Sequence, residues 1–328
     1  MNAKKTLTIF TPAYNRAHTI ERTFQSLCRQ TNKDFEWLII DDGSTDNTKE
    51  LILSLITKET LSYPLIEKEP NENIETYFEG NCKDGFLIRY FYQQNQGMHG
   101  AHNTAYKHIN TELNTCIDSD DYMPDDAVDI IVNLWKERGN NKYAGIVGLD
   151  YADKGGIIGT EFPQDMKETT LNGFYLQGGR GDKKLVYRTD VIKKYPEYPT
   201  FKGERYFSLG YKYLLIDQDY LLLTINKPLV IVDYQLDGSS FNMYRQYWTN
   251  PNGFIFLRKE HMQYQTLLRN KYRSCVHYIS HCIRAGRIKE FLSNPCPILS
   301  FLAIIPGTFL YFFTKYKVYN HKMMNIKN

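Results

Sequence analysis

Residues 35–46 have the sequence FEWLIIDDGSTD, an apolar run that ends in two aspartates and a glycine. The apolar residues 35–40 predict a β-strand. Ser44 or Thr45 can cap a helix that continues through Leu51 and Leu55, because a side-chain oxygen at this position accepts hydrogen bonds from the first free backbone amides. The stretch therefore predicts a strand, a polar loop and a helix in succession.

The same succession occurs on both sides of this stretch. We expect further strands at 7–10, 86–92, 113–117 and 143–149, and helices at 19–29, at 99–109 and from Pro124 onward. Strands that alternate with helices favour an α/β fold in which helices cover a mostly parallel sheet. Residues 58–85 are polar and without period, and are expected to form an insertion or long loop.

The second half of the chain has a different pattern. Residues 151–240 are mixed and rich in glycine, whereas the chain after 254 is helical and basic without a strand signal. We therefore expect one α/β domain over 1–240 and a helical region over 241–328.

Charge and cysteine content restrict the class of protein. The formal net charge of +3 in 328 residues is too small to indicate nucleic acid as a partner. The six cysteines form no C-x-x-C pair, and the start of the chain lacks the pattern of a signal peptide. A reduced, cytoplasmic protein is expected.

Four polar clusters each follow a predicted strand, at 11–16, 41–46, 95–103 and 118–121. Ligands of open parallel sheets bind at the carboxyl ends of the strands. The four clusters are therefore expected to form one site at one edge of the sheet.

The last cluster contains three carboxylates, Asp118, Asp120 and Asp121, within four residues. Such crowding is unfavourable unless a cation or hydrogen-bond donors compensate it. Carboxylate oxygens suit Mg²⁺ or Mn²⁺, which often bridge a protein to substrate phosphates. The alternative is an acidic start to the following helix.

Four motifs, TPAYNR at 11–16, DDGSTD at 41–46, Asn95-x-Gly97 through His102-Asn103, and DSDD at 118–121, resemble in order and spacing those of family-2 glycosyltransferases of GT-A fold. The resemblance covers roughly residues 5–240. It implies a central, mostly parallel sheet with flanking helices, a nucleotide-sugar donor (usually a UDP-sugar), inversion at the anomeric carbon, and a divalent metal, Mn or Mg, at an Asp-x-Asp motif.

The resemblance also implies roles for individual residues. Asp120 corresponds to the metal ligand, and Asp42, with Asp41 beside it, to the carboxylate that contacts uracil and ribose. Arg more often stands at the position of His102, so this residue departs from the commoner pattern. The donor-binding set implied by the motifs is Thr11, Pro12, Tyr14, Asn15, Asp41, Asp42, Asn95, His102, Asp118 and Ser119.

A hydroxyl acceptor needs a general base, which family members usually carry as an acidic pair at the start of a helix in the second half. Glu204, in FKGERYF, is the best match, although Arg205 replaces the second acid. Asp217 and Asp219 are the alternatives for the base.

The stretch from Cys296 to Phe313 has no charge and lies between basic residues. Prolines interrupt it, which favours an interfacial helix pair on an anionic membrane surface, with contact through 284–317, over a straight span. A helix buried in the core is the alternative. The spacing of Cys275, His277, His281 and Cys282 could hold zinc, but ordinary helix packing is the favoured explanation.

The sequence thus predicts a glycosyltransferase that moves a sugar from a nucleotide diphosphate to a hydroxyl of a glycan or lipid-linked acceptor in surface polysaccharide assembly, peripheral on the inner face of the cell membrane. The rivals are a sugar-1-phosphate nucleotidyltransferase and a non-catalytic nucleotide-sugar-binding or scaffold protein. A Rossmann dehydrogenase is excluded because no G-x-G-x-x-G follows the first strand. Donor sugar, acceptor and oligomeric state stay open.

Overall fold

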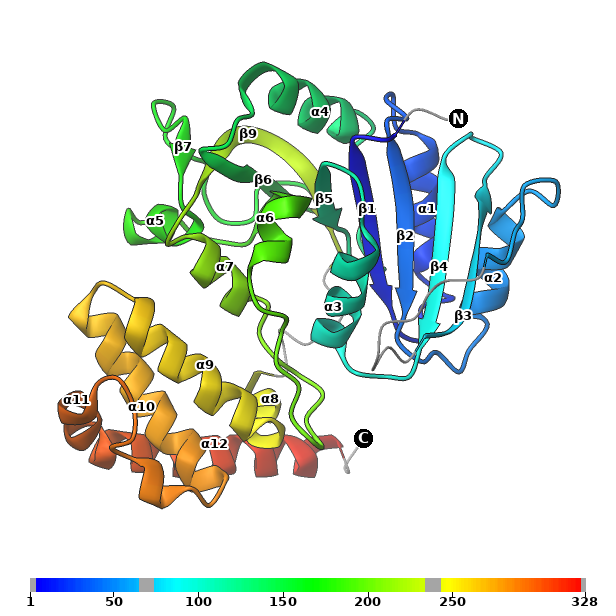
Figure 1. Cartoon of the computed structure of the whole chain (residues 1–328). Helices are drawn as coiled ribbons and strands as arrows, with labels where there is room; N and C mark the ends of the chain where they lie inside the picture. The colour runs from blue at the N-terminus through cyan, green and yellow to red at the C-terminus, as the bar shows by residue number, and fades with distance from the viewer. Residues whose placement is uncertain (1–3, 65–73, 234–242, 326–328) are drawn as a thin grey trace. The chain divides into compact units, whose positions relative to one another are not determined.

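The computed structural model describes residues 4–64, 74–233 and 243–325 (Figure 1). The chain divides into two compact units. The first unit comprises Met1–Glu197 and Asp219–Tyr234, and the second comprises Tyr198–Gln218 and Gln235–Asn328. Residues 198–218 thus group with the C-terminal helices, and the domain boundary expected at residue 240 stays a prediction.

The first unit is built on a nine-stranded sheet with the order β3-β4-β2-β1-β5-β8-β6-β9-β7. Its strands are β1 (Leu7–Ala13), β2 (Phe35–Asp41), β3 (Ile74–Asn81), β4 (Leu87–Gln93), β5 (Leu113–Cys116), β6 (Tyr143–Ala152), β7 (Glu168–Thr169), β8 (Lys183–Arg188) and β9 (Leu221–Val232). Each strand expected from the sequence is present.

Strand direction decides where the loops meet. β1 is parallel to β2 and β5, and β2 is parallel to β4. β8 is antiparallel to both β5 and β6, and β6 is parallel to β9, so β6 and β9 run in the same direction as β5. The carboxyl ends of β1, β2, β4, β5, β6 and β9 therefore lie at one edge of the sheet, as expected for a mostly parallel α/β fold.

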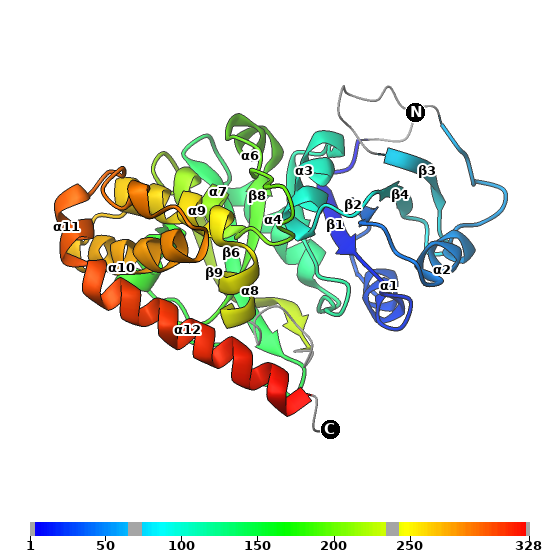
Figure 2. The ribbon, with the colours of Figure 1, turned by 90° about the horizontal axis from the view of Figure 1, so that it is seen from below.

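Helices cover both faces of this sheet. They are α1 (Ile20–Cys28), α2 (Thr48–Leu55), α3 (Met98–His108), α4 (Ala127–Arg138), α5 (Leu171–Leu176) and α6 (Thr189–Lys194). Figures 1 and 2 show α1 and α2 on one face and α3 on the other. The predicted apolar face of α1, Ile20, Phe24 and Leu27, is buried, and Phe24 stacks on Trp37 at 6.0 Å.

One expectation for the first unit was wrong. Residues 58–85 were expected to form a long loop, but β3 occupies 74–81 and pairs antiparallel with β4 at the edge of the sheet. Its residues alternate between apolar and charged, which suits an edge strand. Residues 65–73 of the expected loop lie outside the described residues.

The regular elements described in the second unit are helices, joined by loops. Its helices are α7 (Gly210–Ile216), α8 (Met243–Thr249), α9 (Pro251–Tyr264), α10 (Leu268–Arg284), α11 (Pro297–Leu302) and α12 (Ile304–Asn325). Its core contains Cys275 and Cys282 among apolar side chains, and the described residues offer no group of three His, Cys, Asp or Glu suited to a metal. Packing therefore accounts for the motif that was weighed as a zinc site.

Candidate active site

The loops that follow β1 and β2 are joined by hydrogen bonds. The side-chain oxygen of Asn15 accepts from the backbone N–H of Thr45 at 2.8 Å, and the backbone N–H of Asn15 donates to Ser44 Oγ at 2.8 Å. Asn15 holds a left-handed backbone conformation with φ of 54°. Tyr14 is 48% exposed beside it. Two motifs distant in sequence thus form one surface at the carboxyl edge.

Asp41 and Asp42 are buried, and their carboxylates bind the protein itself. Asp41 accepts from the Tyr90 hydroxyl at 2.6 Å. Asp42 accepts from the Gln93 side chain at 2.7 Å and from the backbone amides of Gln96 and Gly97 at 2.8 and 2.7 Å. In this structure Asp42 shapes the loop after β4, so its expected contact with uracil and ribose stays a prediction.

Gly43 allows the loop after β4 to lie close to the loop after β2. Its φ is +86°, and a Cβ built on it would lie 3.0 Å from the backbone nitrogen of Asn95. Only glycine adopts this backbone conformation without strain while allowing such an approach. The positions expected to contact the donor at 41–42 and at Asn95 are thereby brought together.

Two expected donor contacts point into the core. Thr11 is fully buried, and its hydroxyl accepts from Trp37 Nε1 at 3.0 Å. His102 is also fully buried, with Nδ1 2.9 Å from the Met98 carbonyl and its ring edge against Phe10 at 5.0 Å. The Thr11 hydroxyl is therefore engaged inside the protein, and the donor-binding roles expected for Thr11, Pro12 and His102 stay predictions.

The acidic cluster at 118–121 is tied to the end of β9. Asp121 Oδ1 accepts from the backbone N–H of Asp233 at 3.0 Å, and Tyr122 exchanges two backbone hydrogen bonds with Ile231. Ser119 is buried, whereas Asp118 and Asp120 stay partly exposed. Asp233 thus joins a cluster that the sequence placed only at the end of β5.

Arg22, on α1, holds this arrangement and was missed from the sequence. Its Nη2 donates to the backbone carbonyl of Asp120 and to Asp233 Oδ2, the latter at 2.8 Å. Its guanidinium also lies 3.7 Å from Asp153 and over the ring of Tyr122 at 5.0 Å. One cation therefore connects the ends of β5, β6 and β9.

Asp150 is a second residue that was missed. It lies near the end of β6, is 7% exposed, and its Oδ1 is buried without a hydrogen-bond partner. Burial raises the pKa of its carboxyl to about 6. An aspartate after an apolar strand is the same signal that identified Asp41 and Asp118, so the sequence did contain the means to find it.

The cluster carries more negative charge than its surroundings compensate. Burial, followed by repulsion from Asp118, raises the pKa of Asp120, and the same two causes raise the pKa of Asp121 to about 8. The side chains of Asp118 and Asp120 offer carboxylate oxygens, which are the donors that Mg²⁺ and Mn²⁺ prefer. A divalent cation fits this donor set, provided that it completes its coordination with water or substrate oxygens, since the described residues contain no three-donor group.

Glu204, the expected base, lies in the second unit. Its Oε1 accepts from the backbone and side-chain amides of Asn252, and its Oε2 from the backbone of Gly253, each at 2.8 Å. These residues form the first turn of α9, where free N–H groups favour an anion. The contacts favour a capping role, and catalysis by Glu204 stays a prediction.

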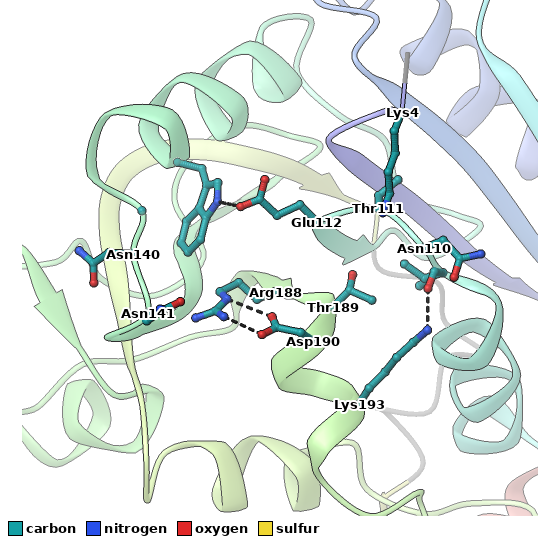
Figure 3. Close-up of a pocket in the computed structure, with 13 residues that line it drawn as sticks. Lys4, Asn110, Thr111, Glu112, Asn140, Asn141, Arg188, Thr189, Asp190 and Lys193 are labelled. Carbon is teal, nitrogen blue, oxygen red and sulfur yellow. Dashed lines mark hydrogen bonds and ion pairs between the residues drawn. The ribbon is translucent and has the colours of Figure 1, made fainter. Parts of the chain in front are cut away.

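A separate pocket of about 560 Å³ lies at the opposite edge of the sheet, near the amino ends of β1 and β5 (Figure 3). Two of its three cations are engaged: Arg188 pairs with Asp190 at 2.6 Å, and Lys193 Nζ donates to the Ile109 carbonyl at 2.7 Å. None of the residues expected to bind the donor lines this pocket.

Comparison with known proteins gives the family. The family model "Glycosyl transferase family 2" matches residues 8–195. The GalNAc(5)-diNAcBac-PP-undecaprenol beta-1,3-glucosyltransferase of Campylobacter jejuni is 27% identical over 193 residues, which are 57% of this chain and 53% of that protein. The chain thus spans about half the length of this relative.

Two solved structures share the fold. S. aureus TarS 1-349 in complex with UDP-GlcNAc has a TM-score of 0.54 and 15% identity, with 96% of this chain and 92% of that chain covered. The mannosyltransferase PcManGT from Pyrobaculum calidifontis, in complex with GDP-Man and Mn²⁺, has a TM-score of 0.51 and 14% identity, with 97% and 86% covered. The fold is that of the GT-A glycosyltransferases, with an added C-terminal helical segment, and the chain belongs to glycosyl transferase family 2.

Proposed function

We propose that this chain transfers a sugar, with inversion, from a UDP-sugar to a hydroxyl of a glycan or lipid-linked acceptor in polysaccharide assembly. The observation that carries the proposal is the group of acids at the carboxyl edge, Asp118, Asp120, Asp150 and Asp233, in which Arg22 binds the Asp120 carbonyl and the Asp233 carboxylate. Family membership and the names of the related proteins support it.

The residues of this edge suit the separation of charge in glycosyl transfer. The linked loops after β1, β2 and β4 provide backbone groups against which a nucleoside can lie. Asp120, with Asp118, would hold the divalent cation, whose chemistry is to offset the charge that develops on the leaving diphosphate. Arg22 fixes the backbone of Asp120, and the unpartnered Oδ1 of Asp150 can accept from a sugar hydroxyl.

The general base is proposed at Glu204, with Asp217 and Asp219 as the alternatives. A base must lie within hydrogen-bond reach of the acceptor hydroxyl. Glu204 accepts three hydrogen bonds from α9, so one lone-pair position on Oε2 stays open to an acceptor hydroxyl, and Asp219 accepts from the Tyr195 hydroxyl at 2.7 Å. Separate kinetic and stability measurements on Glu204→Gln distinguish the two roles.

We further propose peripheral binding of the chain to an anionic membrane, on its cytoplasmic face, through 284–317. In the described residues no helix combines the length and apolar character needed to cross a bilayer. The buried residues between 297 and 314 are small: Ser300, Ala303, Gly307 and Thr314. A Cβ on Gly307 would lie 2.6 Å from Ile279 Cβ, so the close packing depends on this glycine.

Several large apolar residues of α11 and α12 face outward, whereas Leu299 and Ile304 pack partly buried against the helical core. Ile305 is 82% and Phe309 75% exposed. The outward-facing row is Ile298, Phe301, Leu302, Ile305, Phe309, Phe312, Tyr316 and Tyr319. Figure 2 shows both helices along the margin of the second unit. Residues 261–328 contain ten lysines and arginines and a single acid, Glu290, which suits anionic lipid.

Sedimentation with vesicles tests the membrane contact. Wild-type protein is expected to sediment with vesicles that contain phosphatidylglycerol, and the double variant Ile305→Asp/Phe309→Asp to stay in the supernatant. The control variant is Tyr63→Asp, which changes an exposed residue of the first unit. Thr308→Asp, on a less exposed face of α12, is unsuitable as a control because the Thr308 hydroxyl donates to the Ile304 carbonyl. Equal sedimentation of all three proteins, or of the wild type with neutral vesicles only, contradicts the proposal.

A panel of UDP-sugars tests the transferase activity. The purified chain is expected to release UDP from one of them in the presence of Mn²⁺ or Mg²⁺, faster with acceptor than without. Release of inorganic diphosphate from a nucleotide triphosphate and a sugar phosphate would identify a nucleotidyltransferase instead. Binding of UDP-sugar without turnover, with any acceptor tried, would favour the non-catalytic alternative.

A further inference from the structure

A group of cationic and imidazole side chains lies among α8, α9 and α10. We call it the Arg258 cluster, and its members are Arg258 and His261 on α9 and Arg273, His277 and His281 on α10. Arg258 Nη1 lies 3.4 Å from His261 Nδ1. The ring of Tyr247, on α8, contacts the rings of His277 and His281 at 5.6 and 5.2 Å. The cluster is built entirely within the second unit.

The cluster contains polar atoms that the protein leaves unsatisfied. Arg258 Nε, His277 Nδ1 and His281 Nε2 are buried, and no hydrogen-bond partner for them occurs in the described chain. Most buried polar side-chain atoms have a partner, so three orphans in one place require an explanation. His281 is 3% exposed, whereas Arg258, His261 and His277 keep part of their surface exposed. A small group from solution can therefore reach the exposed surfaces of Arg258, His261 and His277, which carry or adjoin these buried atoms.

The sign of the charge indicates what kind of group is missing. No described Asp or Glu forms an ion pair with Arg258 or Arg273. Burial, followed by the positive charge of Arg258, lowers the pKa of His261 and His277 to about 3, so both are neutral. A metal cation would be repelled by the guanidinium, whereas an anion would supply the charge that a buried arginine requires.

We propose that the Arg258 cluster binds a phosphate or diphosphate group. The guanidinium presents parallel N–H donors that match the oxygens of such a group, and neutral imidazoles can each donate one more hydrogen bond. A phosphate group has three or more oxygens around one centre, so it can accept from donors that lie on several sides of it. Phe254, stacked on His281 at 5.1 Å, fixes that ring at the base of the cluster.

The test uses inorganic diphosphate and the full-length chain in the presence of a chelator, which removes metal-dependent binding by the acids of the first unit. Thermal unfolding and calorimetry are measured for the wild type, Arg258→Met and the matched control Arg269→Met, which changes an exposed arginine of α10. Diphosphate is expected to raise the Tm of the wild type and of Arg269→Met by several degrees. Arg258→Met is expected to unfold at a higher temperature than the wild type without ligand, because an uncompensated buried cation has been removed, and to lose the response to diphosphate.

A second variant keeps the test decisive if Arg258→Met folds poorly. Arg258→Lys retains the charge but loses the paired donors, and is expected to bind diphosphate about tenfold more weakly. Farnesyl diphosphate distinguishes the source of the group: binding at least tenfold tighter than inorganic diphosphate identifies a lipid headgroup, and equal binding a free phosphate compound. The proposal is overturned if diphosphate does not raise the Tm of the wild type, or if it raises the Tm of the wild type and of both Arg258 variants equally. Asp120→Asn should keep the response, so failure of the proposed transferase activity leaves this test intact.

Discussion

Replacing Glu204 by Gln separates a catalytic role of this residue from a structural one. The wild-type carboxylate accepts three hydrogen bonds of 2.8 Å from the first turn of α9. Glutamine keeps one acceptor oxygen, but its NH₂ group must then face an N–H donor of Asn252 or Gly253. Hydrogen bonds to a charged group contribute about 1.5–3 kcal/mol each, and a helix cap about 0.5–2 kcal/mol. We therefore expect a loss of about 2 kcal/mol of stability in the second unit.

Two assays on the same protein give the answer. Thermal unfolding is expected to show a Tm lower by several degrees than that of the wild type, and Glu161→Gln, which changes an exposed glutamate of the first unit, is expected to show no shift. Transfer is then measured at a temperature where both proteins are folded. If Glu204 is also the base, the transfer rate falls by roughly 10²–10⁴-fold while donor affinity is kept.

The results that would refute this reasoning are specific. An unchanged Tm for Glu204→Gln would show that the contacts to α9 contribute little to stability. Normal transfer by the folded variant, together with loss of transfer in Asp217→Asn or Asp219→Asn, would assign the base to one of the alternatives.

Three further predictions concern other parts of the molecule. The free energy of unfolding of the second unit should be highest above about pH 6.5, where His261 and His277 are neutral in the folded and the unfolded state, and should fall as the pH decreases toward 3, because only the unfolded chain then takes up protons. Unfolding followed by near-ultraviolet dichroism at pH 7.5 and pH 5 measures this difference, and equal stability at the two pH values contradicts the prediction. Gly307→Val should cost about 1–3 kcal/mol in urea unfolding, since its Cβ would meet Ile279, whereas Ile305→Val, at an exposed position, should cost almost nothing. Arg22→Met should lower kcat/KM about 10–100-fold with little change in Tm, because it removes the hydrogen bonds that position the Asp120 backbone and the Asp233 carboxylate. A kcat/KM equal to that of the wild type would show that these hydrogen bonds do not contribute to catalysis.

The sequence was sufficient for features that depend on neighbouring residues. The apolar face of α1 and the strand at 35–41 follow from local periodicity, and glycine at position 43 indicates a tight loop. β3 was not predicted because residues 58–85, which contain its charged residues Glu75 and Glu79, were interpreted as a polar loop. An edge strand such as β3 is also stabilised by pairing with β4 rather than by its own strand propensity.

The site was only partly predictable for the same reason. Asp118 and Asp120 lie in a recognisable motif, but Arg22 contacts the Asp120 carbonyl from a helix 98 residues earlier in the chain. Glu204 is a further case, since motif order suggested a base, which stays a prediction, while its contact with α9 across 48 residues could not be foreseen. Tertiary contacts of this kind have no local signal in the sequence.

The most direct test of the proposed function is metal-dependent UDP release by Asp120→Asn. The side chain of Asp120 is partly exposed at the carboxyl edge, so the fold is expected to tolerate the change, with a Tm close to that of Asp126→Asn, which alters an exposed acid before α4. With Mn²⁺ and the preferred UDP-sugar, we expect Asp120→Asn to release UDP roughly 10³-fold more slowly than the wild type and than Asp126→Asn. Release at the wild-type rate by Asp120→Asn, or by the wild type in excess chelator, would contradict it.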